Sequence, residues 1–167
     1  ALGAVPVEPD GTFALGGLAP DGRYDLELRQ GWDGDLLAQV EGAQVGTPVE
    51  MGDVPGGRRR IVAILGGTFA GPQVKGTVMP GGADWQLVRP DGLAMLDTRY
   101  ALETDKGERV YIQNVGVRHA PPDVTARLLA GQAVDPNLVY FRATPVFETS
   151  APGLQWLTRS TFVGTGE

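Results

Sequence analysis

The chain has 167 residues, no cysteine and a formal net charge of −6 at pH 7, with 42% hydrophobic and 20% charged residues. These values fit one globular chain that can bury a core, and they argue against a mainly disordered protein. The lack of cysteine excludes disulfides, thiolate nucleophiles and cysteine-bound metals, and the acidic balance argues against nucleic acid or a membrane surface as the main partner.

Glycines and prolines stand singly or in pairs between alternating apolar runs, which is typical of turns in an all-β chain. Residues 1–30 predict a β-hairpin, with Asp10-Gly11 and Asp21-Gly22 among its turn signals. Further strands are expected in a series of short runs at 58–71, 73–80, 84–90, 93–104 and 108–116. Strands that follow one another through short turns predict an antiparallel up-and-down meander, closed or nearly closed into a β-barrel.

One segment interrupts the β pattern. Residues 121–132 read PPDVTARLLAGQ, with prolines at the start, Asp123 in the first turn and Gly131 suited to a C-terminal cap. We predict a short helix over about 122–130 that covers one end of the barrel. Two more strands are expected, one within 138–149 and one over 154–166.

The order of several blocks resembles the bacterial and fungal domain of unknown function 3237 family. The blocks are VPGGRRRIVAILGGTFAGP, KGTVMPGGADWQLVRPDG, LDTRYALETDKGERVYIQNVG, YFRATPVFET and WLTRSTFVGTG. The resemblance covers about residues 35–167 and implies a compact antiparallel β-barrel. The earlier run DGTFALGGLAPDGRYDLELR resembles half of a carboxypeptidase-regulatory-like β-sandwich. We therefore expect an N-terminal hairpin extension, residues 1–34, that packs on a barrel domain of residues 35–167.

Polar and acidic residues recur on strand faces that are otherwise apolar. Because side chains alternate along a strand, Asp84 and Gln86 share one face while Trp85 faces the other way, but the period alone leaves open which face is interior. Our hypothesis is a barrel pocket into which five side chains converge: Asp84, Gln86, Arg99, Glu103 and Asn114. Carboxylates beside an arginine in such a pocket can serve as general acid or base. The alternative is that Arg99 forms a structural or surface ion pair with Asp97 or Glu103.

Other candidates carry a functional and a structural interpretation each. His119, the one histidine, is a candidate acid or base or else a structural loop residue, and no His-rich metal site is expected. In GGRRR, Arg58 and Arg60 share a face and could bind an anion, although we favour a solvent-facing strand start. The remaining ligand-binding candidates are Arg142 and the aromatic residues Trp85, Tyr140 and Trp156. Such aromatic residues could form an apolar pocket floor but are more often plain core.

No P-loop, G-x-G-x-x-G, H-E-x-x-H or G-x-S-x-G motif is present, and we expect no cofactor. The leading hypothesis is a small-molecule-binding β-barrel with acid/base chemistry, an isomerase, cyclase or lyase acting on a small organic acid or secondary metabolite. Asp84 and Glu103 would transfer protons and Arg99 would hold an oxyanion. The alternatives are a lipocalin-like carrier and an interaction domain that uses the N-terminal hairpin. We expect a cytoplasmic protein, with export after removal of a leader left open, and a homo-oligomer through sheet edges as a further option.

Overall fold

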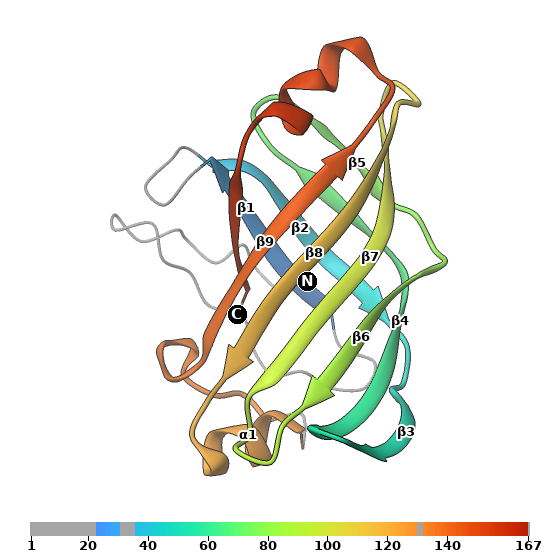
Figure 1. Cartoon of the computed structure of the whole chain (residues 1–167). Helices are drawn as coiled ribbons and strands as arrows, with labels where there is room; N and C mark the ends of the chain where they lie inside the picture. Colours follow the sequence, from blue (N-terminus) through green and yellow to red (C-terminus); the bar gives the residue numbers. More distant parts are fainter. Residues whose placement is uncertain (1–22, 31–35, 130–131, 167) are drawn as a thin grey trace.

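Strands joined by short turns run almost without interruption through the computed structural model, which describes residues 23–30, 36–129 and 132–166 (Figure 1). The strands are β1 (Arg23–Gln30), β2 (Leu36–Val45), β3 (Val49–Val54), β4 (Gly57–Ala70), β5 (Lys75–Val78), β6 (Gly82–Val88), β7 (Ala94–Thr104), β8 (Arg109–His119), β9 (Tyr140–Glu148) and β10 (Phe162–Gly166). The helices are α1 (Pro122–Leu129) and the 3-10 helices η1 (Pro136–Leu138) and η2 (Pro152–Arg159).

The strand pairings close the sheet on itself. β7, β8, β9 and β10 pair in chain order, β10 pairs with β1, β1 with β2, and β2 with β4. The first half of β4 then pairs with β6 and its second half with β5, and both of these short strands pair with β7. All of these pairs are antiparallel, so the predicted closed barrel is confirmed (Figure 1).

The strand β1 stands between β2 and β10 in this ring. It corresponds to the second half of the hairpin expected over residues 1–30. The earlier half of that hairpin, with its turn at Asp10-Gly11, lies outside the described residues, so the proposed division of the chain at residue 34 stays a prediction.

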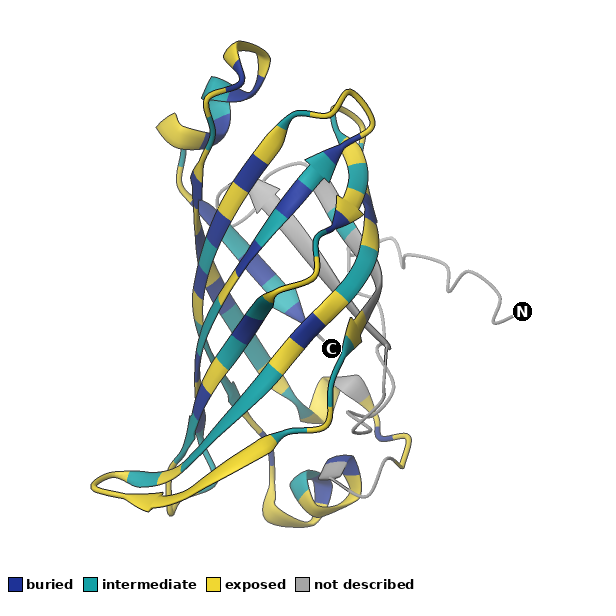
Figure 2. Ribbon diagram, turned by 90° about the vertical axis from the view of Figure 1, so that its right-hand side faces the viewer, coloured by how far each residue is buried: buried dark blue, intermediate teal, exposed yellow. Residues whose placement is uncertain are grey.

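The barrel interior is apolar at the end that carries η2. Its core cluster holds Ile64, Phe69, Val78, Tyr100, Leu102, Val110, Ile112, Phe147, Ala151, Leu154, Leu157 and Phe162. The rings of Phe147 and Phe162 meet edge to face with 5.1 Å between centroids, and Trp156 packs on Phe162 from η2. Figure 2 shows how buried and exposed residues alternate along the strands around this core. The η2 end of the barrel is therefore filled.

The strand expected over 154–166 is wrong in its first part, because residues 152–159 form η2 and the strand begins only at Phe162. Pro152 stands in the first turn of η2, where its missing N–H has no partner to lose. Leu154 and Leu157 are three residues apart and both buried, and a helix with three residues per turn puts such a pair on one face.

The helix predicted over 122–130 is confirmed as α1 and lies at the opposite end of the barrel from η2 (Figure 1). Val124 and Leu128 form a second, smaller core there with Ala120 and Val134. Among the described residues, no helix is long and apolar enough to cross a membrane.

Candidate functional site

The barrel interior turns polar toward the α1 end, and the strand register shows how. Asp84 on β6 pairs with Thr98 on β7, which pairs with Asn114 on β8, so these three residues form one inward-facing row. Because side chains alternate along a strand, the next row toward α1 contains Arg60 beside Gln86. The row beyond it joins Arg58, Val88, Ala94 and Arg118.

Two side-chain hydrogen bonds connect these rows. Arg60 Nε donates to Gln86 Oε1 at 2.6 Å, and Gln86 Nε2 donates to Asp84 Oδ2 at 2.5 Å. Burial raises the pKa of the Asp84 carboxyl, and the hydrogen bonds from Gln86 and Thr98 and the charges of Arg118 and Arg60 oppose that rise. The net effect is a raised pKa, so Asp84 holds its proton to a higher pH than an ordinary aspartic acid does.

Two acceptors in this row have no hydrogen-bond partner among the described residues. They are Asp84 Oδ1 and Asn114 Oδ1, and both atoms are fully buried. Asn114 as a whole is only 6% exposed. An unmet buried acceptor costs about 1–3 kcal/mol of folding free energy. Unsatisfied buried groups are few in native proteins, and a functional role is one reason for keeping them.

A cavity of about 620 Å³ opens at the α1 end, within the size range of small-molecule sites. Arg58, Arg60 and Arg118 contribute to its wall from the barrel interior, and Arg89, which pairs with Asp91 at 2.6 Å, lies at its rim. Glu50 and Asp53 of β3, the strand next to β4, also line the opening. The apolar part of the wall comes from Val54, Val88, Ala94, Ala120 and Leu128.

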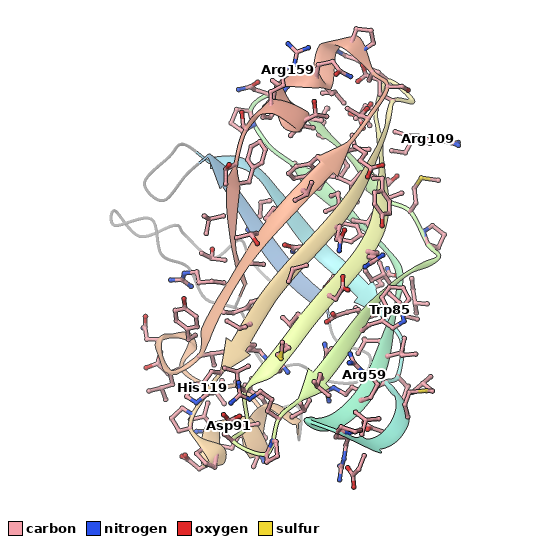
Figure 3. The ribbon with its side chains drawn as sticks, viewed as in Figure 1. Arg59, Trp85, Asp91, Arg109, His119 and Arg159 are labelled. Atoms are coloured by element: carbon pink, nitrogen blue, oxygen red, sulfur yellow. The ribbon has the colours of Figure 1, made fainter. Side chains whose placement is uncertain are left out.

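Of the five side chains predicted to converge in a barrel pocket, the structure brings Asp84, Gln86 and Asn114 together in the interior, inward of the cavity lining, and it places Arg99 and Glu103 on the outer face. Thr98 faces inward opposite Asp84, and its neighbour Arg99 therefore faces outward. Arg99 donates to Asp97 through two contacts of 3.2 Å, which confirms the ion-pair alternative. Glu103 accepts from Arg109 at 3.1 Å, and Arg109 projects away from the barrel in Figure 3.

The aromatic candidates do not line the cavity. Trp85 and Tyr140 are 38% and 51% exposed on the outer face, and the Arg142 guanidinium lies 5.3 Å from the centre of the Tyr140 ring. Trp156 packs on the core at the η2 end. His119, by contrast, belongs to the cavity rim and lies at the α1 end in Figure 3.

Sequence reasoning named Arg58 and Arg60 as a possible anion site but favoured a solvent-facing strand start, and it missed Arg118. Arg58 shares the inward face of β4 with Arg60 but lies at the mouth of the cavity, where it is exposed and pairs with Asp53 at 3.6 Å, whereas Arg60 is partly buried and joins the interior network. Arg118 was not among the candidates. Its spacing from Asn114 and Ile112 on one strand face was the available signal. Among the described residues, no three His, Asp or Glu side chains gather closely enough to hold a metal ion.

Comparison with known proteins places the chain in a family. The profile described as "Protein of unknown function (DUF3237)" matches residues 38–167. The chain belongs to this family. A UPF0311 protein of Rhodopseudomonas palustris strain TIE-1 is 44% identical over 123 residues, which cover 74% of this chain and 80% of that protein.

Solved structures agree with the barrel. The R. palustris protein RPA1785, of unknown function, superposes with a TM-score of 0.71 and 38% identity over 86% of each chain. A β-barrel-like protein of Acinetobacter baumannii AYE superposes with a TM-score of 0.59 and 33% sequence identity, and the match covers 87% of this chain and 92% of that one. An enzyme from Penicillium herquei superposes with a TM-score of 0.53 over 93% of this chain and 97% of that one. At 16% sequence identity, this match shows a shared fold alone. DUF3237 membership therefore establishes the architecture, and the function has to be argued from the site.

Proposed function

We propose that this DUF3237 protein binds a small organic molecule at the α1 end of its barrel and carries out acid/base chemistry on it without a cofactor. The observation that carries the proposal is the hydrogen-bonded chain from Arg60 on the cavity wall through Gln86 to the buried Asp84. A buried carboxyl whose pKa is raised and which lies near the charges of Arg60 and Arg118 is a candidate for proton transfer.

The step that fits these groups is an isomerase, cyclase or lyase reaction that begins with proton transfer. The ionised Asp84 carboxylate takes a proton from a C–H bond next to a carbonyl group. The electron pair of that bond moves onto the carbonyl oxygen, and the charges of Arg60 and Arg118 stabilise it. Asp84 returns a proton, after exchange with solvent, to another carbon, which completes an isomerisation with no other reactant. His119 at the rim is the second candidate for proton transfer.

A carrier of lipocalin type is the second candidate function. The barrel is filled by packed side chains at the η2 end and hollow at the α1 end, so it has the shape of a cup. A barrel of this shape can hold a ligand without reacting with it, and the arginines would then contribute only to binding affinity.

Deuterium exchange separates the two functions. The protein is incubated in D2O, with no added cofactor, with a set of small organic acids that have C–H bonds next to a carbonyl group, and exchange is followed by proton NMR. We expect enzyme-dependent exchange that falls by about 100-fold or more in Asp84→Asn. Glu103→Gln is the matched control, because Glu103 is a carboxylate on the outer face.

Binding of an acid without exchange by the wild type would establish the carrier and overturn the catalytic proposal. Exchange that continues unchanged in Asp84→Asn would remove Asp84 from the proposed step.

A further inference from the structure

We propose that the ligand is an organic anion that carries a hydrogen-bond donor, such as a hydroxyl, at its other end. The anionic group binds Arg58, Arg60 and Arg118 in the cavity wall, and the donor reaches past Gln86, inward of the residues that line the cavity, to the unpartnered oxygens of Asp84 and Asn114. The inference rests on the proposed function, because it concerns the ligand of the same cavity.

The anionic end follows from the charge of the wall. The chain as a whole carries a net charge of −6, yet the charged groups that β4 and β8 turn toward the cavity are the guanidinium groups of Arg58, Arg60 and Arg118. Guanidinium groups bind carboxylates through paired hydrogen bonds, and apolar walls strengthen that attraction.

Two carboxylates face the same opening from the β3–β4 hairpin. Asp53 contacts Arg58 at 3.6 Å with side chains 86% and 64% exposed, and an ion pair this exposed is weak. Glu50 is in register with Arg60 and also lines the cavity. An incoming carboxylate can displace Asp53 from Arg58 at little cost.

The hydrogen-bond donor at the other end of the ligand is inferred from the buried acceptors that have no partner. Asn114 is 6% exposed and its Oδ1 has no partner, and Asp84 Oδ1, in the same row through Thr98, has none either. A ligand hydroxyl placed between them would satisfy an acceptor that the folded protein leaves unpaired. A ligand without a hydrogen-bond donor at that end would leave both acceptors unpaired, which lowers its affinity by about 10-fold or more.

The strand geometry sets the distance between the two ends. With a rise of about 3.3 Å per residue, the row of Arg60 lies about 7 Å from the row of Asp84, and the row of Arg58 about 13 Å. This span excludes a small 2-hydroxy acid, whose two groups adjoin. It matches a rigid acid with the size of a hydroxylated benzoate or cinnamate, and the cavity of about 620 Å³ accommodates a molecule of that class.

Isothermal titration calorimetry with matched probes tests the inference. The probes are 4-hydroxybenzoate, 4-hydroxycinnamate, their analogues without the hydroxyl (benzoate and cinnamate), and the neutral 4-hydroxybenzyl alcohol. We expect at least one hydroxy acid to bind about 10-fold or more tightly than its analogue without the hydroxyl and than the neutral alcohol.

Substitutions show which residues bind each end of the ligand. Arg58→Gln and Arg118→Gln should weaken the binding of the hydroxy acid and of its analogue by the same factor. They should leave the affinity for the alcohol unchanged. Asn114→Leu should remove the difference between the hydroxy acid and its analogue. Arg59→Gln is the matched control, because Arg59 lies between the two inward arginines of β4 and faces outward, where it contacts the Trp85 carbonyl oxygen at 3.4 Å.

The outcomes separate this inference from the proposed function. If the alcohol binds as tightly as the acids, or the acids bind equally to Arg58→Gln, Arg118→Gln and wild type, the anionic end is wrong, and deuterium exchange still decides the function. If each hydroxy acid binds no better than its analogue, the donor end is wrong. If no acid binds and no exchange occurs, both proposals fail.

Discussion

Replacing Asp84 by asparagine should change how the stability of the protein depends on pH. Asparagine keeps the size of the side chain and an oxygen that can accept the hydrogen bond from Gln86, and it removes the ionisable group. The variant therefore isolates the cost of ionising a buried carboxyl.

The direction follows from the raised pKa of Asp84. Below the ordinary aspartate pKa of 3.8, the carboxyl is protonated in both the folded and the unfolded chain, and its ionisation costs the folded state nothing. As the pH rises above 3.8, the unfolded chain releases its proton first, and the folded chain keeps the proton until its own raised pKa is reached. The free energy of unfolding therefore falls across that window and stays lower above it.

The size of the effect is about 1.4 kcal/mol for each unit by which the folded pKa exceeds the unfolded one. In a chain of this size each kcal/mol corresponds to about 2–4 °C in Tm. Thermal unfolding followed by circular dichroism between pH 4 and 8 should show Asp84→Asn gaining Tm relative to wild type as the pH rises.

The matched control is Asp97→Asn, because the Arg99 hydrogen bond lowers the pKa of Asp97 on the outer face. This lowered pKa gives the opposite sign: Asp97 contributes stability above pH 3.8 that is lost as the pH falls, and less than about 1 kcal/mol is expected from so exposed a pair. A constant difference between Asp84→Asn and wild type from pH 4 to 8 would refute the burial of an ionisable Asp84.

Three further predictions concern the fold. Phe162→Ala should lower the free energy of unfolding by about 3–5 kcal/mol in urea denaturation, since Phe162 is 1% exposed in the core, whereas Val146→Ala, at a residue 64% exposed, should change it by less than about 0.5 kcal/mol. Gly82→Ala should lower Tm, because an added Cβ would meet a backbone oxygen of β7 at 2.5 Å; an unchanged Tm would contradict this packing. Glu103→Gln, which breaks the exposed pair with Arg109, should change the free energy of unfolding by less than about 1 kcal/mol, and a larger loss would contradict its place on the outer face.

Most of the fold could be predicted from the sequence because its signals are local. Turn residues between alternating runs predicted the hairpins, and the helix at 122–130 followed from its prolines and the spacing of Val124 and Leu128. The strand expected over 154–166 failed because Leu154 and Leu157 fit a short 3-10 helix as well as they fit part of a strand. A local pattern of this length does not separate the two.

The site could be predicted only in part, because it depends on which strand faces are interior. Alternation grouped Asp84 with Gln86 correctly, but pairing this face with that of Arg99 required the register between β6 and β7, which the sequence does not contain. The composition of β7 held a usable signal. One of its faces carries Leu96, Thr98, Tyr100 and Leu102, and the other carries three charged residues, so the first face was the better choice for the interior.

The central claim is that the inward arginines at the α1 end bind an organic anion, and nitrogen-15 NMR of the arginine guanidinium groups tests it most directly. One spectrum, recorded during a titration with 4-hydroxybenzoate, reports the inward and outward arginines together. We expect the Nε signals of Arg58, Arg60 and Arg118 to shift with a common binding curve while those of Arg59 and Arg99 stay in place. Shifts confined to the outward arginines, or no shift at saturating acid, would contradict the claim.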